Sequence, residues 1–391
     1  MISFQNAIAL ILSKAHSFGQ EDISLENGLG RVLEGDVFAP RDLPPFNRSA
    51  MDGVALRLED LSIGIKEFRC IETIFAGSLF SKKIQRGECY KIMTGASVPE
   101  FADVVIRVED TLEQNEKIEV ISRGAKRYQN ISLKGQDLET AALAIRGGTC
   151  LNAATIGLLA SLGKGKIAVK KLPTVNFITT GDEIIELQQE ISPITIYNSN
   201  KYVLTSLLKQ LGIEIDKYTH VLDDPDALRL TIKKNLQSDI LIITGGVSAG
   251  QADFIPSILE ELGASKNFHK VAIKPGKPIW CGQLGKTMIF ALPGNPFSCL
   301  VTFKLFVEFY INTSLRGAAP TIEKLPLNFE RIKKTSLDEF FPVIIKNGML
   351  NKVDINGSGD VRLGFAANAL AMHAADENIL TKGSQVAYLP L

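Results

Sequence analysis

The chain has 391 residues, of which 45% are apolar and 22% are charged, a globular composition that excludes disordered, collagenous and fibrous proteins. Its 43 basic and 43 acidic residues cancel, so it has no overall basic field for binding nucleic acid or an anionic membrane. The 4 histidines lie far apart and the 5 cysteines form no C-x-x-C pair, which argues against zinc ribbons, disulfide scaffolds and thioredoxin-type motifs and suits a reduced, cytoplasmic protein.

The first half of the chain changes from helical to strand-like patterning. Apolar residues recur at helical spacing over residues 4–15 and predict an amphipathic helix, with no preceding basic residues of the kind a signal peptide carries. Short apolar runs separated by Gly, Pro and Asn turns over residues 28–136 predict an all-β module. A helical pattern returns over residues 151–162.

The region from 173 to 317 alternates strand and helix, which predicts a parallel or mixed sheet covered by helices on both faces. The expected strands are residues 175–179, 214–220, 239–243, 271–273, 279–281 and 288–292. The expected helices are residues 201–211, 225–236, 254–262 and 297–313. Strand-like runs at 325–332, 341–345 and 385–391 predict a small C-terminal β domain. The apolar run at 300–310 contains Lys304 and Glu308, so it is not expected to span a membrane.

Four loops in the α/β region fall at the carboxyl ends of expected strands, where open α/β sheets bind ligands. They comprise residues 179–183, 244–250, 272–278 and 292–298. Each alone has a simpler interpretation: a turn, a bend at Gly245 and Gly246, a solvated lysine loop, or a helix start capped by Asn295. Their joint placement favours a binding site.

The residue types in these loops indicate phosphate chemistry. Adjacent glycines allow backbone N–H groups to approach a phosphate, and the helix start at Ser298 offers a second anion site. Lys274 and Lys277 flank a Pro-Gly turn that holds two ammonium groups near each other. Three carboxylates on separate loops can hold one Mg²⁺ together with substrate phosphate oxygens: Glu183, Asp223 and Asp253. Capping of the helix at Pro225 is the alternative for the Asp223–Asp224 pair, in which Asp224 is the expected cap.

Eight segments, taken together and in this order, match the sequence pattern of one protein family. They read PPFNRSAMDG, IMTGASVPE, ADVVIRVED, TTGDEI, DDPDAL, TGGVSAGQADF, AIKPGKP and LPGNPFS. The chain resembles the MoeA-type molybdopterin molybdenumtransferases, to which the E domain of gephyrin belongs, from its N-terminus to about residue 317. Without the resemblance, Asp52 in the first segment would be interpreted as a turn acid.

The resemblance implies a fold and an assembly. Elongated four-domain subunits form a homodimer, in which the α/β domain of one subunit and the β module of the other share the active site. Domain I would comprise residues 1–27 and 138–171, domain II 28–137, domain III 172–318 and domain IV 319–391. The expected fold class is therefore a central three-layer α/β domain with an inserted β module and a small C-terminal β domain.

The resemblance also implies a reaction, in which molybdenum passes from molybdate into adenylylated molybdopterin, AMP is released and Mg²⁺ is required. Glu183, Asp223 and Asp253 correspond to the acidic cleft and are the expected Mg²⁺ ligands. Asp52, Thr94 and Asp137 correspond to residues that the partner subunit contributes. The substrate-binding set implied for the cleft itself is Gly245, Gly246, Ser248, Lys274, Lys277, Pro293, Asn295 and Ser298. Other cofactor-biosynthesis proteins and molybdoenzymes are candidate partners.

The sequence departs from the family pattern in a few places. Asn47 and Val54 replace a common acid and a common aromatic residue in the first segment. Residues 334–339 lack a frequent Gly-Arg pair. Ser358 lies in a retained Gly-Ser-Gly turn, where molybdate binding and an ordinary turn are both open.

Two other functions remain as alternatives. A molybdopterin adenylyltransferase would share the α/β domain, but it carries GGTG where this chain has Val247 and Ser248. A non-catalytic molybdopterin-binding scaffold is disfavoured by the complete set of three acids.

Overall fold

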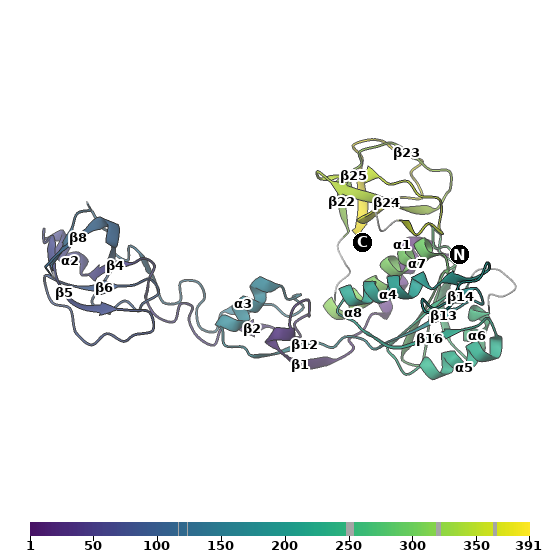
Figure 1. Cartoon of the computed structure of the whole chain (residues 1–391), viewed down its shortest axis with the longest axis horizontal. Helices are drawn as coiled ribbons and strands as arrows, with labels where there is room; N and C mark the ends of the chain where they lie inside the picture. The colour runs from purple at the N-terminus through teal and green to yellow at the C-terminus, as the bar shows by residue number, and fades with distance from the viewer. Residues whose placement is uncertain (116, 123, 248–253, 318–321, 363–365) are drawn as a thin grey trace. The chain divides into compact units, whose positions relative to one another are not determined.

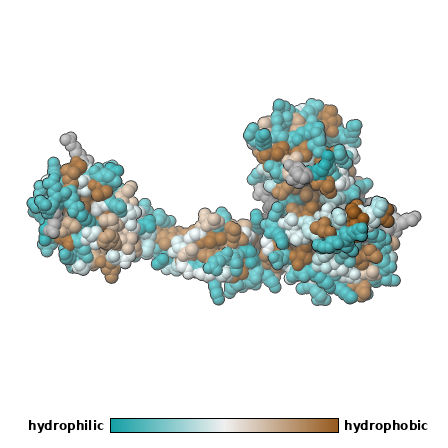
Figure 2. All heavy atoms as spheres, viewed as in Figure 1, coloured by the Kyte–Doolittle hydropathy of each residue, from teal (hydrophilic) through white to brown (hydrophobic). Residues whose placement is uncertain are grey.

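The computed structural model describes residues 1–115, 117–122, 124–247, 254–317, 322–362 and 366–391 (Figure 1). The chain divides into two compact units. The first comprises Met1–Glu34, Gly148–Asn152 and Lys166–Leu391, and the second comprises Gly35–Gly147 and Ala153–Gly165. On the face seen in Figure 2, hydrophilic residues and smaller hydrophobic patches are interspersed over both units. Within the described ranges, no helix is long and apolar enough to cross a membrane.

A six-stranded mixed sheet forms the centre of the first unit. In spatial order its strands are β16 (Ile215–Val221), β13 (Val175–Thr180), β17 (Ile240–Thr244), β21 (Thr287–Leu292), β20 (Trp280–Leu284) and β18 (Ser265–His269). The first four are mutually parallel, β20 runs antiparallel to β21, and β18 runs antiparallel to β20. The sequence did not predict β18, because only Phe268 of this edge strand is buried and the strand has no apolar alternation.

Helices cover both faces of this sheet, as the βα alternation predicted (Figure 1). They are α1 (Phe4–Lys14), α4 (Ser199–Gln210), α5 (Pro225–Asn235), α6 (Ile255–Glu261), α7 (Pro296–Thr302) and α8 (Glu308–Arg316). Ile240 and Ile242 of β17 pack in one hydrophobic cluster with α1, α4, α7 and α8. Leu241 and Ile243 pack in another with α5 and α6. Because side chains alternate along a strand, the two clusters lie on opposite faces and make three layers.

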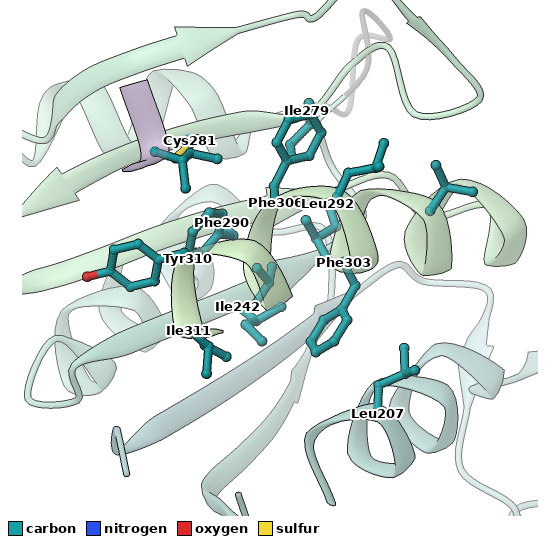
Figure 3. Packing of buried hydrophobic residues seen from close by; sticks show 14 of the residues in the cluster. Leu207, Ile242, Ile279, Cys281, Phe290, Leu292, Phe303, Phe306, Tyr310 and Ile311 are labelled. Carbon is teal, nitrogen blue, oxygen red and sulfur yellow. The ribbon is translucent and has the colours of Figure 1, made fainter. Parts of the chain in front are cut away.

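The expected helix at 297–313 packs on the face of the sheet that carries Ile240 and Ile242, and it supplies many residues of that hydrophobic cluster. It begins at Pro296 and ends at Arg316, with one π-helical segment, Phe303–Val307, between α7 and α8. Tyr310 packs against Phe290 and Phe306 against Phe268 of the sheet, and Phe303 lies in the same hydrophobic cluster as Ile242 (Figure 3). These fully buried aromatic side chains fix the helix, and with it the loop that precedes Pro296.

A second sheet in the first unit contains most of the C-terminal region. In spatial order it contains β19 (Ile273–Lys274), β24 (Asp338–Lys346), β26 (Ala369–His373), β28 (Gln385–Pro390) and β22 (Glu323–Pro326), with β25 (Met349–Lys352) on β24. A smaller pair is formed by β23 (Arg331–Ile332) and β27 (Ile379–Leu380). The predicted strand at 271–273 therefore joins the C-terminal sheet through β19, and its assignment to the α/β sheet was wrong.

Two short strand pairs and a 3-10 turn complete the first unit. The β14 strand (Ile184–Ile185) pairs with β15 (Ile196–Tyr197) in parallel. The β1 strand (Gln20–Ser24) pairs with β12 (Lys166–Lys170) in antiparallel register, and a 3-10 turn follows at Leu25–Asn27.

The second unit contains the predicted β module. Its six-stranded sheet has the order β7 (Val104–Arg107), β4 (Gly53–Leu56), β6 (Glu88–Ile92), β5 (Glu67–Ile74), β9 (Lys117–Val120) and β8 (Thr111–Gln114). It encloses its own hydrophobic cluster, in which Phe68, Tyr90 and Val104 are fully buried. The remaining elements are β2 (Val37–Phe38), β3 (Arg48–Ser49), β10 (Ile131–Ser132), β11 (Leu143–Ile145), α2 (Leu58–Ser62), a 3-10 turn (Val108–Asp110) and α3 (Ala153–Ser161).

Candidate functional site

A pocket of about 1180 Å³ lies at the carboxyl ends of the parallel strands of the first unit. The loops after β13, β16, β17 and β21 all reach it, because parallel strands end at the same edge of a sheet. The predicted site residues that line it are Glu183, Asp223, Gly245, Gly246, Lys274, Lys277, Pro293, Asn295 and Ser298. Ser248 and Asp253 lie outside the described residues.

Two carboxylates line one wall of the pocket. The Thr180 hydroxyl at the end of β13 donates a hydrogen bond to Asp223, and the backbone N–H of Asp223 donates to Asp182 Oδ1 at 3.0 Å. Glu183 lies two residues beyond Gly181, whose φ is 138°. A Cβ at position 181 would lie 2.8 Å from Glu183 Oε2, so glycine leaves the space that this carboxylate occupies. Asp224 caps α5 by accepting from the N–H of Ala227, as predicted.

The two adjacent glycines form the floor of the pocket. Gly245 and Gly246 have φ values of 96° and 62°. A Cβ on Gly245 would lie 2.6 Å from the carbonyl oxygen of Thr180. The bend and the pocket floor are therefore made by the same residues, because only glycine allows this backbone to touch β13.

The two lysines line the pocket from the end of β19, where Lys274 lies, and from the loop that follows it, where Lys277 lies. The turn between them is tight, since Gly276 has a φ of 101° and its Cβ would lie 2.5 Å from Thr302 Cγ2 of α7. Lys274 Nζ lies 3.5 Å from Glu339 Oε1 of β24. Both lysine side chains belong to exposed residues, so their ammonium groups are accessible to an incoming anion.

The start of α7 forms a further wall. Asn295 occupies the N-cap position, but its side chain donates to Ser358 Oγ at 3.0 Å and makes no cap hydrogen bond within the helix. The backbone N–H of Phe297 donates to the Ser358 carbonyl oxygen at 3.1 Å. Ser298, one residue further, is buried with 4% exposure. The Gly-Ser-Gly turn of the C-terminal region thus lies directly on this helix start and lines the pocket through Ser358.

Sequence reasoning missed several residues of the pocket. Asn198, Ser199 and Asn200 line it from the start of α4, where an asparagine before a helix signals a cap and nothing more. Arg331 of β23 and Glu339 of β24 line it from the C-terminal region. Their place depends on β24 pairing with β19, which is a long-range contact that no local pattern predicts.

The remaining predicted residues lie in the second unit. Asp52 Oδ1 accepts hydrogen bonds from the Thr94 hydroxyl at 2.7 Å and from its backbone N–H at 2.6 Å. The side-chain hydrogen bond, followed by the backbone one, holds the pKa of Asp52 below its ordinary value. Asp137 is exposed, and its N–H donates to the Leu43 carbonyl oxygen at 2.9 Å.

Two of the three predicted metal ligands, Glu183 and Asp223, lie among the described residues. Among the residues placed by the structure, no three of His, Cys, Asp and Glu are grouped so as to hold a metal ion, and Asp253 is outside that set. Glu183 and Asp223 provide two carboxylates in one pocket, and oxygen donors of this kind suit a hard ion such as Mg²⁺.

Comparisons with known proteins cover both units. A family model described as the MoeA N-terminal region (domain I and II) matches residues 2–163, and one described as a probable molybdopterin binding domain matches residues 176–313. A molybdopterin molybdenumtransferase of Staphylococcus epidermidis is 35% identical over 345 residues, which cover 87% of this chain and 80% of the relative. One of Synechocystis sp. is 32% identical over 348 residues, which cover 88% and 86%.

A solved structure agrees with these matches. The molybdopterin biosynthesis MoeA protein from Pyrococcus horikoshii OT3 aligns with a TM-score of 0.86 and 28% identity, covering 100% of both chains. The fold class and the family resemblance predicted from the sequence are thereby confirmed. The ranges matched by the two family models contain every predicted site residue.

Proposed function

The chain belongs to the family of molybdopterin molybdenumtransferases, and from this membership we propose that it inserts molybdenum from molybdate into adenylylated molybdopterin and releases AMP. It is an enzyme of molybdenum cofactor biosynthesis, a transferase whose proposed location is the cytoplasm. The observation that supports the proposed chemistry most directly is one pocket, at the ends of the parallel strands, that is lined by Glu183, Asp223 and two exposed lysines.

The lysines have the task of binding the oxyanion. Molybdate is a tetrahedral dianion, and Lys274 and Lys277 place two ammonium groups on one turn at the pocket wall. Ser298, at the start of α7, contributes a hydroxyl on the neighbouring wall. The dithiolene of the pterin supplies the soft sulfur ligands that molybdenum prefers, so the pocket is not required to supply cysteine.

The carboxylates are assigned to the cleavage of the phosphate anhydride. Glu183 and Asp223, together with Asp253, would hold Mg²⁺, and the absence of a side chain at Gly181 gives the Glu183 carboxylate its room. When bound, this ion would neutralise negative charge on the phosphate oxygens of the departing AMP. Thr180 orients Asp223 by donating to one of its oxygens, and the floor at Gly245 and Gly246 allows a phosphate to approach the backbone closely.

The substitution Asp223→Asn tests this proposal. We expect it to lower molybdate-dependent AMP release by about a hundredfold or more, since it removes charge from the site of phosphate stabilisation. Asp226→Asn is the matched control, because Asp226 is an exposed acid of the same helix start that pairs with Arg229. AMP is measured by chromatography with adenylylated molybdopterin as substrate, and ATP consumption is followed in parallel.

Two results would contradict the proposal. One is a folded Asp223→Asn variant that releases AMP at the parent rate. The other is ATP consumption by the parent chain with molybdopterin, which would support the adenylyltransferase alternative.

We also propose a homodimer in which the Asp52–Thr94 pair and Asp137 of one subunit complete the pocket of the other. The family membership supports this arrangement. So does the exposure of the Asp52–Thr94 pair, in which a hydrogen-bonded carboxylate of lowered pKa is left accessible on the β module.

A further inference from the structure

The pocket contains a buried carboxylate that the proposed chemistry does not use. Glu339 of β24 is the backbone register partner of Lys274 of β19, in parallel strands that join the α/β domain to the C-terminal sheet. Its side chain is 7% exposed, whereas that of Lys274 is 58% exposed. Glu339 Oε1 lies 3.5 Å from Lys274 Nζ, so a buried carboxylate lies next to an exposed ammonium group in the lining of the pocket.

Glu339 is held firmly in this position. Its Oε2 accepts a hydrogen bond from Arg331 at 2.6 Å, and its Oε1 accepts one from the Thr335 hydroxyl at 2.7 Å. Arg331 is fixed in turn by His373 Nδ1 at 2.8 Å and by the ring of Phe341, whose centroid lies 4.2 Å from its Cζ. Burial raises the pKa of Glu339, but the hydrogen bonds from Arg331 and Thr335 outweigh it and leave the pKa below its ordinary value, so the group is ionised at neutral pH.

Glu339 balances the charges of the side chains that the structure describes in the pocket lining. The described lining has as many cationic as anionic side chains: Lys274, Lys277 and Arg331 against Glu183, Asp223 and Glu339. Among the residues placed by the structure, Lys277 has no carboxylate within ion-pair distance, whereas Lys274 and Arg331 both pair with Glu339. A site built only for tight anion binding would gain nothing from such a counter-charge.

We propose that Glu339 sets the affinity of the pocket for its oxyanion, by offsetting the charge of Lys274 so that molybdate is held weakly enough to be passed on. The inference rests on the proposed function, because it assumes that the lysines bind the oxyanion. The physical reason is that a dianion held too tightly in the ground state is stabilised without any gain in the transition state, which slows its transfer. Glu339 is thus a tuning residue, which acts through Lys274 rather than on the substrate.

Direct binding to the full chain tests the proposal with two tetrahedral anions of similar size, molybdate with charge −2 and perrhenate with charge −1. We expect Glu339→Gln to bind molybdate roughly three- to tenfold more tightly, since a Coulomb repulsion is removed at close range. For perrhenate, the logarithm of the fold-increase in affinity should be about half that for molybdate, because Coulomb energy scales with ligand charge. A merely structural role would weaken both anions or neither.

Glu323→Gln is the matched control. Glu323 lies on β22 at the opposite edge of the same sheet, where it accepts a hydrogen bond from Tyr388, and its substitution changes the net charge equally. We expect this control to leave both affinities unchanged. Binding is measured by calorimetry, with near-UV circular dichroism as the check on folding.

Lys274→Gln distinguishes a failure of the proposed lysine site from a failure of the inference about Glu339. If this variant binds molybdate like the parent chain, the lysine site itself is wrong and the proposed function fails. If it binds molybdate more weakly while a folded Glu339→Gln variant shows no gain, only the inference about Glu339 is wrong. Should Glu339→Gln fail to fold, Glu339→Asp replaces it: the shortened side chain draws the charge away from Lys274, and an unchanged or lower molybdate affinity would overturn the proposal.

Discussion

Gly245 shows how a single residue brings two strand ends of the pocket into contact. Its backbone lies so close to β13 that a Cβ would approach the Thr180 carbonyl oxygen to 2.6 Å, and its φ is 96°. Thr180 is also the residue whose hydroxyl orients Asp223. The glycine is therefore needed for packing, and the same packing holds a carboxylate of the proposed metal site.

We predict that Gly245→Ala lowers the free energy of unfolding by about 2 kcal/mol or more, the cost of a left-handed backbone with a side chain plus the displacement of β13. Gly294→Ala is the matched control in the same pocket. Its Cβ would make only an ordinary contact of 3.7 Å, with Gly245 Cα, and its φ is not positive. Urea unfolding followed by circular dichroism measures both, and equal losses in the two variants would contradict the explanation.

A hydrogen-bonded group around Tyr218 connects four elements at the edge of the pocket. The Tyr218 hydroxyl of β16 donates to Glu186 at 2.6 Å, accepts from Asn198 at 2.8 Å and lies 3.0 Å from Thr179 Oγ1 of β13. Asn198 caps α4 and lines the pocket. Lys201 pairs with Glu186 and lies over the Tyr218 ring, with its Nζ 4.1 Å from the ring centroid. Positions of β13, β16, the segment after β14 and the start of α4 are thus linked through one hydroxyl.

We predict that Tyr218→Phe costs about 1–3 kcal/mol of stability, because its partially buried partners lose a hydrogen bond that water replaces poorly. Tyr202→Phe is the control, since Tyr202 is 41% exposed on α4 and also lies near Lys201. The measurement is thermal unfolding together with hydrogen exchange at residues 196–200. Exchange in this segment that is no faster in Tyr218→Phe than in the control would show that the hydroxyl does not hold the pocket wall.

Local patterns predicted most elements but could not assign each strand to its sheet. The strands at 175–180, 240–244 and 287–292 are buried along their whole length, and each was evident because it is rich in apolar and β-branched residues. The short β19 strand was expected in the α/β sheet and instead pairs with β24. A two-residue strand carries too little pattern to specify a partner, so the choice is made by the packing of whole sheets.

At the scale of the whole molecule, the proposed site draws on both units of the chain. Glu183 and Asp223 belong to the first unit, and Asp52 and Thr94 belong to the second. Each unit has its own buried hydrophobic core. The proposed homodimer brings these residues together across subunits, so two inactive variants are expected to complement each other in a mixed dimer.

We predict that mixed dimers of an Asp52→Asn chain and an Asp223→Asn chain recover activity that neither variant has alone. With heterodimers isolated by two different tags, one of the two sites is intact, so about half of the wild-type activity per dimer is expected. Glu183→Gln combined with Asp223→Asn is the control, because both lesions belong to the same unit and every site keeps one of them. Inactive Asp52–Asp223 heterodimers would contradict the cross-subunit site.

The sequence by itself determined the composition class, the alternating α/β core, the β module, the family and the loops that line the pocket. These depend on local periodicity, on turn residues and on motif order, which are written along the chain. The division into four domains and the roles of the individual site residues stay predictions. Only the tertiary structure decided that β19 joins the C-terminal sheet, that Ser358 binds the start of α7, and that Glu339 lies beside both Lys274 and Arg331. The physical reason is that the contacts of Asn295 with Ser358 and of Lys274 with Glu339 join residues 63 or more positions apart, so they arise only when separately folded layers pack together.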